Sequence, residues 1–326
     1  MTTASAPGKV ILFGEHAVVS GTLAFGSAVD LRAMVSVEDS TGSLVVEVRD
    51  LNISVDGFSV DLLTKKVQSN FAADALYAAR YVSAVLRDLD ATNLKVRIDS
   101  QIPSGSGLGS SAAITVASLA AVSEHLGIKM SKEEIAKSAH RIEKEVQKGL
   151  GSPMDTALAT FGGYQLVSSG KAESIELPSL DLVVGYTGIP HDTRSEVQKV
   201  QGFRSSYPEV VNPIFESIGE ISKRSIILLK EKRLAELGAF MNTNHGLLEA
   251  LGVNTRELSD LVYAARGAGG VLGSKLTGAG GGGCMVALPG TLGAEAAMTA
   301  IRQAKGSAFH VRTGCEGVKL ELCSRS

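Results

Sequence analysis

Two spacings of hydrophobic residues recur along the chain, and they predict strands and helices in mixed order. Leu94, Val96 and Ile98 alternate with polar residues, which is typical of a half-buried strand. Short continuous apolar runs predict buried strands over residues 10–13, 182–186 and 284–288. Residues 33–37 and 44–48 flank a turn-rich segment and therefore predict an antiparallel pair.

Helical spacing covers much of the remaining chain, beginning with residues 70–87. Residues 111–126 are apolar on nearly every face, which predicts a helix buried at the centre of its domain. Ser131 and Glu134 form a capping-box pattern that starts the next helix. Further helical patterns cover residues 194–204, 208–230, 231–242, 255–267 and 292–304.

Length and order of elements favour two α+β domains. A chain of 326 residues exceeds one ordinary core. Strands and helices that mix without strict alternation are typical of an α+β architecture. The composition shifts at residues 168–174, where Ser-Ser-Gly-Lys predicts a hairpin turn or a domain boundary. We therefore expect an N-terminal domain over residues 1–170 and a C-terminal domain over residues 171–326.

The charge balance and the cysteines exclude several classes of protein. A formal net charge of -2 leaves no electrostatic footprint for nucleic acid, and no block of Lys and Arg predicts membrane binding. No apolar stretch reaches the roughly 18 residues of a transmembrane helix. Cys284, Cys315 and Cys323 fit neither a disulfide framework nor a zinc ribbon, and Cys284 is expected to be a small buried residue. With no signal-peptide pattern, these features predict a cytoplasmic protein.

The most informative glycine cluster lies between a predicted strand and the predicted buried helix. Glycine lets the backbone approach a ligand closely, and the following helix presents free N–H groups and the positive end of its dipole. This order predicts a loop that binds the phosphates of ATP, and the alternative is a tight turn without a ligand. The loop has neither the P-loop sequence nor the dinucleotide fingerprint. It consists of Pro103, Ser104, Gly105, Ser106, Gly107, Leu108, Gly109, Ser110 and Ser111.

A second glycine run, residues 278–283, follows Lys275-Leu276-Thr277 and precedes an apolar strand. Ordering so many glycines costs conformational entropy. We expect close packing against a nucleotide or against the first loop to offset that cost. The alternative is a flexible linker, which the apolar strands on both sides disfavour.

Polar residues at strand and helix ends are candidates for chemistry. Glu143 lies at the edge of an apolar stripe, where it needs Mg²⁺ or a basic side chain as a partner. Asp155 follows a helix break, where a carboxylate accepts a hydroxyl proton or caps a helix. Lys9 precedes the first strand, and Glu15 and His16 follow it. Polar side chains at the end of a strand commonly face a cleft, which is one interpretation of these residues. The alternative is a surface turn with a solvated pair.

Together these motifs resemble those of the GHMP kinases, a family of ATP-dependent small-molecule kinases. The sequences at 103–112 and 275–284 are highly specific for that family, and the resemblance extends from Ala6 to about Leu288. Residues 6–19 are similar to the branch that phosphorylates mevalonate, and residues 147–156 resemble the archaeal form of that branch.

The resemblance implies a two-domain fold, with an N-terminal domain like ribosomal protein S5 and a C-terminal ferredoxin-like domain. It implies ATP as co-substrate, Mg²⁺ as cofactor and transfer of phosphate to the 5-hydroxyl of (R)-mevalonate, in isoprenoid synthesis. A homodimer is expected by the same analogy.

The resemblance also implies roles for individual residues. Asp155 would act as the general base, and Lys9 would lower the pKa of the attacking hydroxyl. Residues 103–111 would wrap the ATP phosphates. Glu143, with Ser110 or Ser111, would hold Mg²⁺. The acceptor pocket would be lined by Glu15, His16 and Thr187.

Two alternatives stay open. Related kinases act on phosphomevalonate, on the mevalonate 3-hydroxyl or on homoserine, and two departures from the pattern, Ser20 and Met154, bear on which acceptor fits. A non-catalytic sensor of ATP and metabolite is the second alternative. A sensor need not keep Lys9, Glu143 and Asp155, so the presence of all three argues against this alternative.

Overall fold

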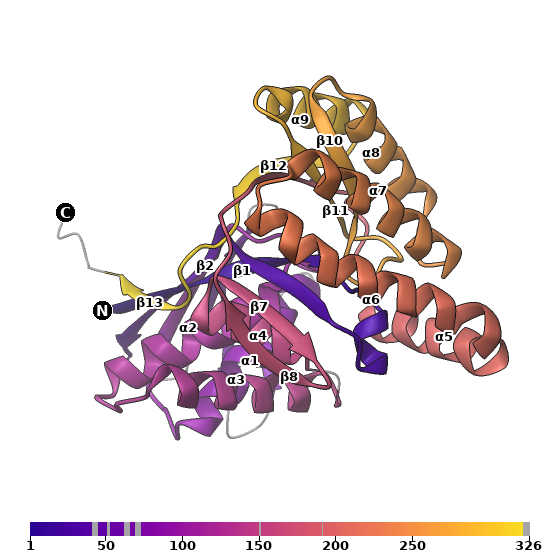
Figure 1. The fold of residues 1–326 in the computed structure, drawn as a ribbon. Coiled ribbons are helices and arrows are strands. Elements are labelled where there is room, and N and C mark those ends of the chain that lie inside the picture. The colour runs from indigo at the N-terminus through magenta and orange to yellow at the C-terminus, as the bar shows by residue number, and fades with distance from the viewer. Residues whose placement is uncertain are drawn as a thin grey trace.

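The chain folds around two separate sheets, which lie at opposite ends of the molecule in Figure 1. The computed structural model describes residues 1–40, 45–50, 53–61, 66–68, 73–149, 151–190 and 192–321. Within these ranges one sheet has nine strands and the other has four. The mixture of sheet and helix confirms the predicted α+β class.

The larger sheet is built mainly from the first half of the chain, in the order β13-β1-β2-β6-β3-β4-β5, with β7 paired to β2 and β8 paired to β7. The C-terminal strand β13 returns to pair with β1. The strands are β1 (Thr2–Phe13), β2 (Ala24–Asp39), β3 (Val45–Asp50), β4 (Ile53–Asp61), β5 (Lys66–Gln68), β6 (Leu94–Ser100), β7 (Tyr164–Ser168), β8 (Lys171–Ile175) and β13 (Lys319–Glu321).

Four helices pack with this sheet, and the central one is buried as predicted. Helix α2 contacts β1 and β2 as well as α1 and α3, and its residues from Ser110 to Ser123 are buried. Helix α3 begins at a complete capping box between Ser131 and Glu134, also as predicted. The helices are α1 (Ala73–Asp88), α2 (Ser110–His125), α3 (Lys132–Val146) and α4 (Pro153–Phe161).

The smaller sheet has the strand order β10-β11-β9-β12, with every described pair antiparallel. Numbered along the chain from β9, this order is 2-3-1-4, which is that of a ferredoxin-like sheet, as predicted. Cys284 is buried at the start of β11, and burial raises the pKa of its thiol. The strands are β9 (Asp181–Tyr186), β10 (Val271–Thr277), β11 (Cys284–Pro289) and β12 (Ser307–Arg312).

Helices connect and cover the strands of the smaller sheet (Figure 1). They are α5 (Thr193–Ser206), α6 (Pro208–Lys230), α7 (Leu234–Ala250), α8 (Arg256–Gly267) and α9 (Gly293–Gln303). Helix α7 runs further than the predicted 231–242 because it packs along β10. A Cβ atom at Gly238 would lie 2.4 Å from the backbone oxygen of Leu272, so the missing side chain allows this close contact.

The predicted antiparallel pairing of residues 33–37 with 44–48 is wrong. Leu44 lies outside the described residues, and β3 instead pairs in parallel with β6. Strand β6 lies between β2 and β3, where Leu94, Val96 and Ile98 are buried. Local turn chemistry predicted a hairpin, but burial of the apolar face of β6 decides the pairing.

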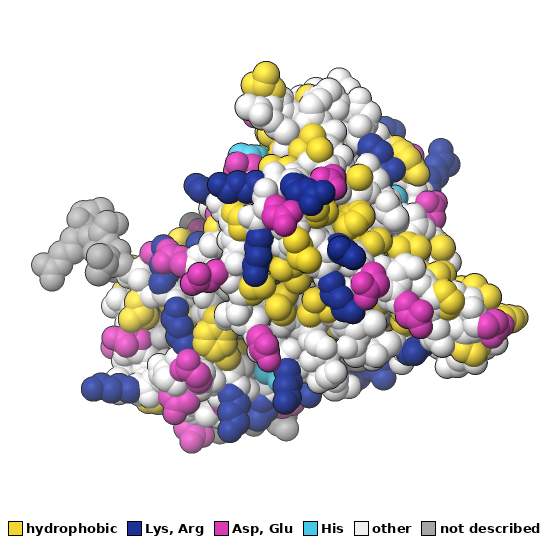
Figure 2. All heavy atoms as spheres, in the orientation of Figure 1, with side chains coloured by type: hydrophobic (Ala, Val, Ile, Leu, Met, Phe, Trp, Pro, Cys, Tyr) yellow, Lys and Arg dark blue, Asp and Glu magenta, His cyan; other side chains and the backbone are white. Residues whose placement is uncertain are grey.

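Charges of both signs are interspersed on the face shown in Figure 2, in keeping with the small net charge. Among the described residues, no helix is both long and apolar enough to cross a bilayer. The segment at 168–174 forms the β7–β8 hairpin, so β8 joins the larger sheet although it follows residue 170. The domain division at that residue stays a prediction.

Candidate active site

The glycine-rich loop is fixed against β1 at the point where α2 begins. The backbone N–H of Lys9 donates to the carbonyl of Leu108 at 2.8 Å. Gly109 caps α2 with a φ of 76°, and a Cβ atom there would lie 2.8 Å from Cγ of Lys9. Only glycine suits this left-handed, crowded position. The loop therefore brings the free N–H groups of α2 next to the Lys9 side chain.

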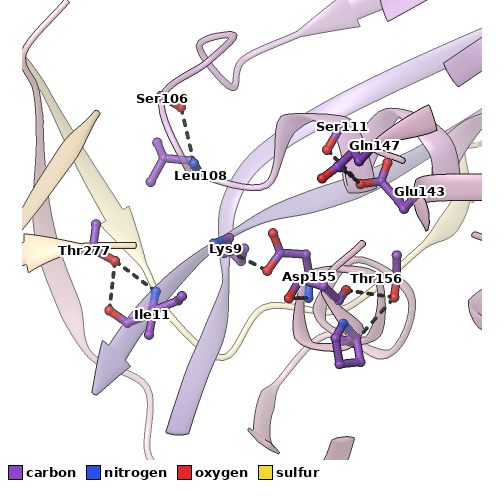
Figure 3. A network of polar contacts seen from close by, with 12 residues as sticks. Lys9, Ile11, Ser106, Leu108, Ser111, Glu143, Gln147, Asp155, Thr156 and Thr277 are labelled. Carbon is purple, nitrogen blue, oxygen red and sulfur yellow. Dashed lines mark hydrogen bonds and ion pairs between the residues drawn. The ribbon is translucent and has the colours of Figure 1, made fainter. Parts of the chain in front are cut away.

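The Ser106 side chain faces into the loop. It is fully buried, and its hydroxyl donates to the carbonyl of Pro103 at 2.6 Å. The same hydroxyl accepts from the N–H of Leu108 at 3.4 Å, as Figure 3 shows. These bonds hold the loop in shape. The backbone and not this hydroxyl is therefore the surface offered to a phosphate.

Lys9 and Asp155 meet beside this loop, as Figure 3 shows. Lys9 Nζ lies 3.4 Å from Oδ1 of Asp155. Asp155 is in the first turn of α4, where its N–H binds the Ser152 side chain and leaves its carboxylate free to face Lys9. Both residues line a cavity of about 190 Å³, with Gly105, Gly107, Gly109, Ser110 and Ser111 of the loop.

Glu143 is buried near this cavity, among hydrogen-bond donors from two helices. It accepts from Ser111 at 3.0 Å, from Thr115 at 3.1 Å and from the Gln147 amide at 2.5 Å. Burial raises the pKa of the Glu143 carboxyl to about 7, because these hydrogen bonds offset only part of the cost of removing the charge from water. An additional positive charge would stabilise the ionised form.

The residues next to Glu143 fit a magnesium ion. The buried Ser110 hydroxyl has no hydrogen-bond partner among the described residues, so an oxygen ligand is available there. Mg²⁺ commonly takes one or two carboxylates together with substrate phosphates, and needs no dense acidic cluster. In keeping with this, the described residues contain no group of three His, Cys, Asp or Glu side chains that could hold a metal.

A second, larger cavity of about 530 Å³ adjoins the first. The two share the wall residues Ile11, Ser152, Thr193, Gly278 and Ala279. The larger cavity is mostly apolar, and the residues specific to it include Glu15, His16, Val19 and Met154. A phosphate donor in one cavity and a small acceptor in the other would meet at their common wall.

Glu15 forms a buried ion pair that joins the two sheets. Its carboxylate accepts from Lys275 Nζ on β10 and from the Asn244 amide on α7, the latter at 3.2 Å. The Lys275 and Glu15 side chains are 0% and 1% exposed. Charges this deeply buried need one another, because neither has water as an alternative partner.

His16 and Thr187 hold the second glycine run from two sides. His16 Nε2 donates to the carbonyl of Ala279 at 2.8 Å, from a backbone with the uncommon φ of 59°. Burial lowers the pKa of His16, so its neutral form is favoured. The Thr187 hydroxyl donates to the carbonyl of Gly283 at 3.0 Å. His16 reaches the larger cavity, whereas Thr187 lines neither of the two cavities in the part of the chain that the structure describes.

Thr277 adds a further link between the sheets, visible in Figure 3. Its hydroxyl accepts from the Ile11 N–H at 3.0 Å and donates to the Ile11 carbonyl at 2.9 Å. The second glycine run is closely packed, but the contacts of Gly280, Gly281 and Gly282 are with Val253, Glu196 and Ile189 and not with the first loop that was expected. Gly278 and Ala279 line the first cavity, and packing of the run against a nucleotide stays a prediction. The flexible-linker alternative is wrong.

His245 is buried near Lys275 of the Glu15–Lys275 ion pair, and it makes the free energy of unfolding depend on pH. Burial, helped by the charges of Arg266 and Lys275, lowers the pKa of His245 to about 4. Its Nδ1 accepts from the Leu276 N–H at 3.4 Å, which requires the neutral ring. A depressed pKa contributes stability that is complete above the unfolded value of 6.5 and is lost as pH falls towards 4.

We expect His245→Gln to flatten the fall in stability between pH 6.5 and 4, by on the order of 3 kcal/mol. Urea unfolding at several pH values measures this difference. His310→Gln, at an exposed position on β12, is the matched control and should leave the pH profile as in the parent chain. An unchanged profile in His245→Gln would show that His245 is not responsible.

Several residues of the site were not predicted from the sequence. Thr115 and Gln147 lie four positions after Ser111 and Glu143, and this helical spacing was the available signal. Asn244 and Tyr77 gave no local signal, because only packing brings their helices to the site.

Two parts of the chain match models of known protein families, and these matches agree with the geometry of the site. Residues 75–163 match the model for the GHMP kinases N terminal domain, and residues 225–307 match the model for GHMP kinases C terminal. The two sheets, with a glycine loop and a buried carboxylate at their junction, define the GHMP class of kinases.

Comparison with individual proteins shows which member of the GHMP class this chain resembles. Mevalonate kinase from Pyrococcus horikoshii is 44% identical, over 99% of this chain and 98% of that protein. The Methanothermobacter thermautotrophicus mevalonate kinase is 38% identical over 88% of this chain and 89% of its own. The crystal structure of the Methanococcus jannaschii mevalonate kinase matches with a TM-score of 0.81 and 29% identity, over 95% of this chain and 98% of the other. The chain belongs to the mevalonate kinases, within the GHMP family.

Proposed function

We propose that this protein transfers the γ-phosphoryl group of ATP to the 5-hydroxyl of (R)-mevalonate, which gives 5-phosphomevalonate for isoprenoid synthesis. The observation that carries the proposal is the Lys9–Asp155 pair, 3.4 Å apart, beside the phosphate loop and next to the cavity for an acceptor. Relatives named mevalonate kinase support the choice of acceptor. An L. major mevalonate kinase that matches this fold with a TM-score of 0.80 and 27% identity, over 96% of each chain, was crystallised with R-mevalonate.

Binding of ATP would use residues 103–111. Their glycines and the first turn of α2 present N–H groups to the phosphates, and the dipole of α2 favours negative charge at that end. Phosphoryl transfer depends mainly on positioning and on stabilising the charge of the transition state. The rigid attachment of the loop to Lys9 provides such positioning.

Magnesium would be held by Glu143 together with Ser110 or Ser111. When bound, the ion neutralises charge on the phosphates and orients them. The raised pKa of Glu143 and the Ser110 hydroxyl, which has no hydrogen-bond partner among the described residues, support this assignment.

The acceptor hydroxyl would lie against Asp155. Its oxygen attacks the γ-phosphorus, the bond from that phosphorus to the β-phosphate oxygen breaks, and ADP leaves. Asp155 takes the hydroxyl proton, and the positive charge of Lys9 lowers the pKa of the hydroxyl in the same step. We assign Glu15, His16 and Thr187 to the acceptor side. Glu15 and His16 line the larger cavity, whereas Thr187 would act through Gly283.

An assay of the full chain with ATP and Mg²⁺ tests this function across three acceptors, mevalonate, phosphomevalonate and homoserine. Turnover is expected with (R)-mevalonate and should yield the 5-phosphate, identified by NMR. Turnover only with phosphomevalonate or homoserine, or formation of the 3-phosphate, would contradict the proposal. Binding of ATP and mevalonate without turnover would instead identify a sensor. A cytoplasmic location and a homodimer stay predictions from the sequence.

A further inference from the structure

Helix α1 brings a tyrosine to the phosphate cavity that none of the family motifs contains. Tyr77 lines this cavity with Ser111, Gln147 and Asp155. Helix α1 packs against α2 and α3, so the position of Tyr77 is set by the same core that holds Ser111 and Glu143. Tyr77 is therefore part of the wall of the cavity that the glycines of the loop also line.

The Tyr77 phenol accepts a hydrogen bond from a second tyrosine one helical turn further along α1. The Tyr81 hydroxyl donates to the Tyr77 oxygen at 3.3 Å, and the two rings meet edge to face at 5.0 Å between centroids. The Tyr77 oxygen is the acceptor of this bond, so the proton of Tyr77 is not used in it. Ser111 lines the same cavity and donates its own proton to Glu143 at 3.0 Å. The proton of Tyr77 is therefore available to an acceptor oxygen that enters the cavity.

Both phenols stay protonated at neutral pH. Burial raises the pKa of Tyr77 and of Tyr81, and the nearby carboxylate of Glu143 raises both further. Tyr77 is thus a neutral donor in a cavity that is lined by the carboxylate of Asp155 and lies near that of Glu143. A protonated phenol can donate a hydrogen bond to a phosphate oxygen, whereas a phenolate could only accept one.

We propose that Tyr77 is a further catalytic residue, whose phenol donates a hydrogen bond to an oxygen of the transferring γ-phosphoryl group. The inference rests on the proposed function for its choice of reaction. A charged phosphoryl oxygen is a strong acceptor, so a nucleotide in this cavity favours a hydrogen bond from the Tyr77 phenol. The bond from Tyr81 fixes the direction of the donor in advance.

The test is Tyr77→Phe in the full chain, which keeps the ring and removes one oxygen atom. We expect kcat for mevalonate to fall by about 10²- to 10³-fold, in the range of a lost donor to the transition state, with KM for mevalonate changed less than about twofold. The Kd of ATP with Mg²⁺, measured by calorimetry, should rise about fivefold as one hydrogen bond is lost.

Tyr164→Phe is the matched control, because it removes a buried phenol oxygen that bonds to Pro178 and Thr313 outside both cavities. It should leave kcat and the ATP Kd unchanged. The proposal is overturned if Tyr77→Phe changes neither quantity by more than twofold. If the parent protein turns over no mevalonate, the proposed function fails, and the ATP Kd of the two variants alone decides the role of Tyr77.

Discussion

Asp155→Asn is expected to lower kcat by roughly 10²-fold or more, in the range of a lost acid–base group. The amide keeps the size of the carboxylate but accepts no proton from the acceptor hydroxyl. It also removes the charge that Lys9 Nζ faces at 3.4 Å. Binding of ATP should change little, because the loop at 103–111 and α2 are untouched. Steady-state kinetics with mevalonate and calorimetry with ATP measure the two quantities.

The control for this variant is Asp99→Asn, at an exposed position on β6. It makes the same chemical change in the same domain, and it should keep the kcat of the parent chain. If Asp155→Asn also kept that kcat, Asp155 would have no part in the mechanism.

Lys275→Met is expected to cost about 3–5 kcal/mol of unfolding free energy. The substitution leaves the Glu15 carboxylate buried at 1% exposure and without its cation, and within the described part of the chain the Asn244 amide is then its only side-chain hydrogen-bond partner. The loss comes from the unpaired charge, since a Met side chain of similar length fills most of the same space. Urea unfolding followed by circular dichroism measures the change.

The double variant Glu15→Gln with Lys275→Met separates charge from packing. It removes both charges, so it should be clearly more stable than Lys275→Met alone. Lys223→Met is the matched control, because Lys223 pairs with Glu220 on the exposed side of α6, where water screens the interaction and little change is expected. A Lys275→Met protein as stable as the Lys223→Met protein would show that the ion pair does not hold the sheets together.

Much of the fold followed from local sequence patterns. The buried helix α2, the capping box of α3 and the strand at 284–288 each depend on residues within a few positions of one another. The pairing of β3 with β6 did not follow, because a strand distant in sequence took the place that the local turn at 39–42 had predicted. Strand partners are set by which apolar faces can be buried together, and spacing alone does not contain that information.

The sequence by itself determined the class of kinase and the position of the glycine loop, because the glycines at 105–109 and the helix after them act through their own backbone. Only the tertiary structure decided which side chains meet. It pairs Glu15 with Lys275 across 260 positions and places Tyr77 and Ser111 on the wall of one cavity. These contacts arise where helices and sheets pack, and each partner is specified by a different part of the chain. The glycine loop can therefore be predicted from the sequence, whereas the other residues that line its cavity, such as Tyr77, are brought there by the whole fold.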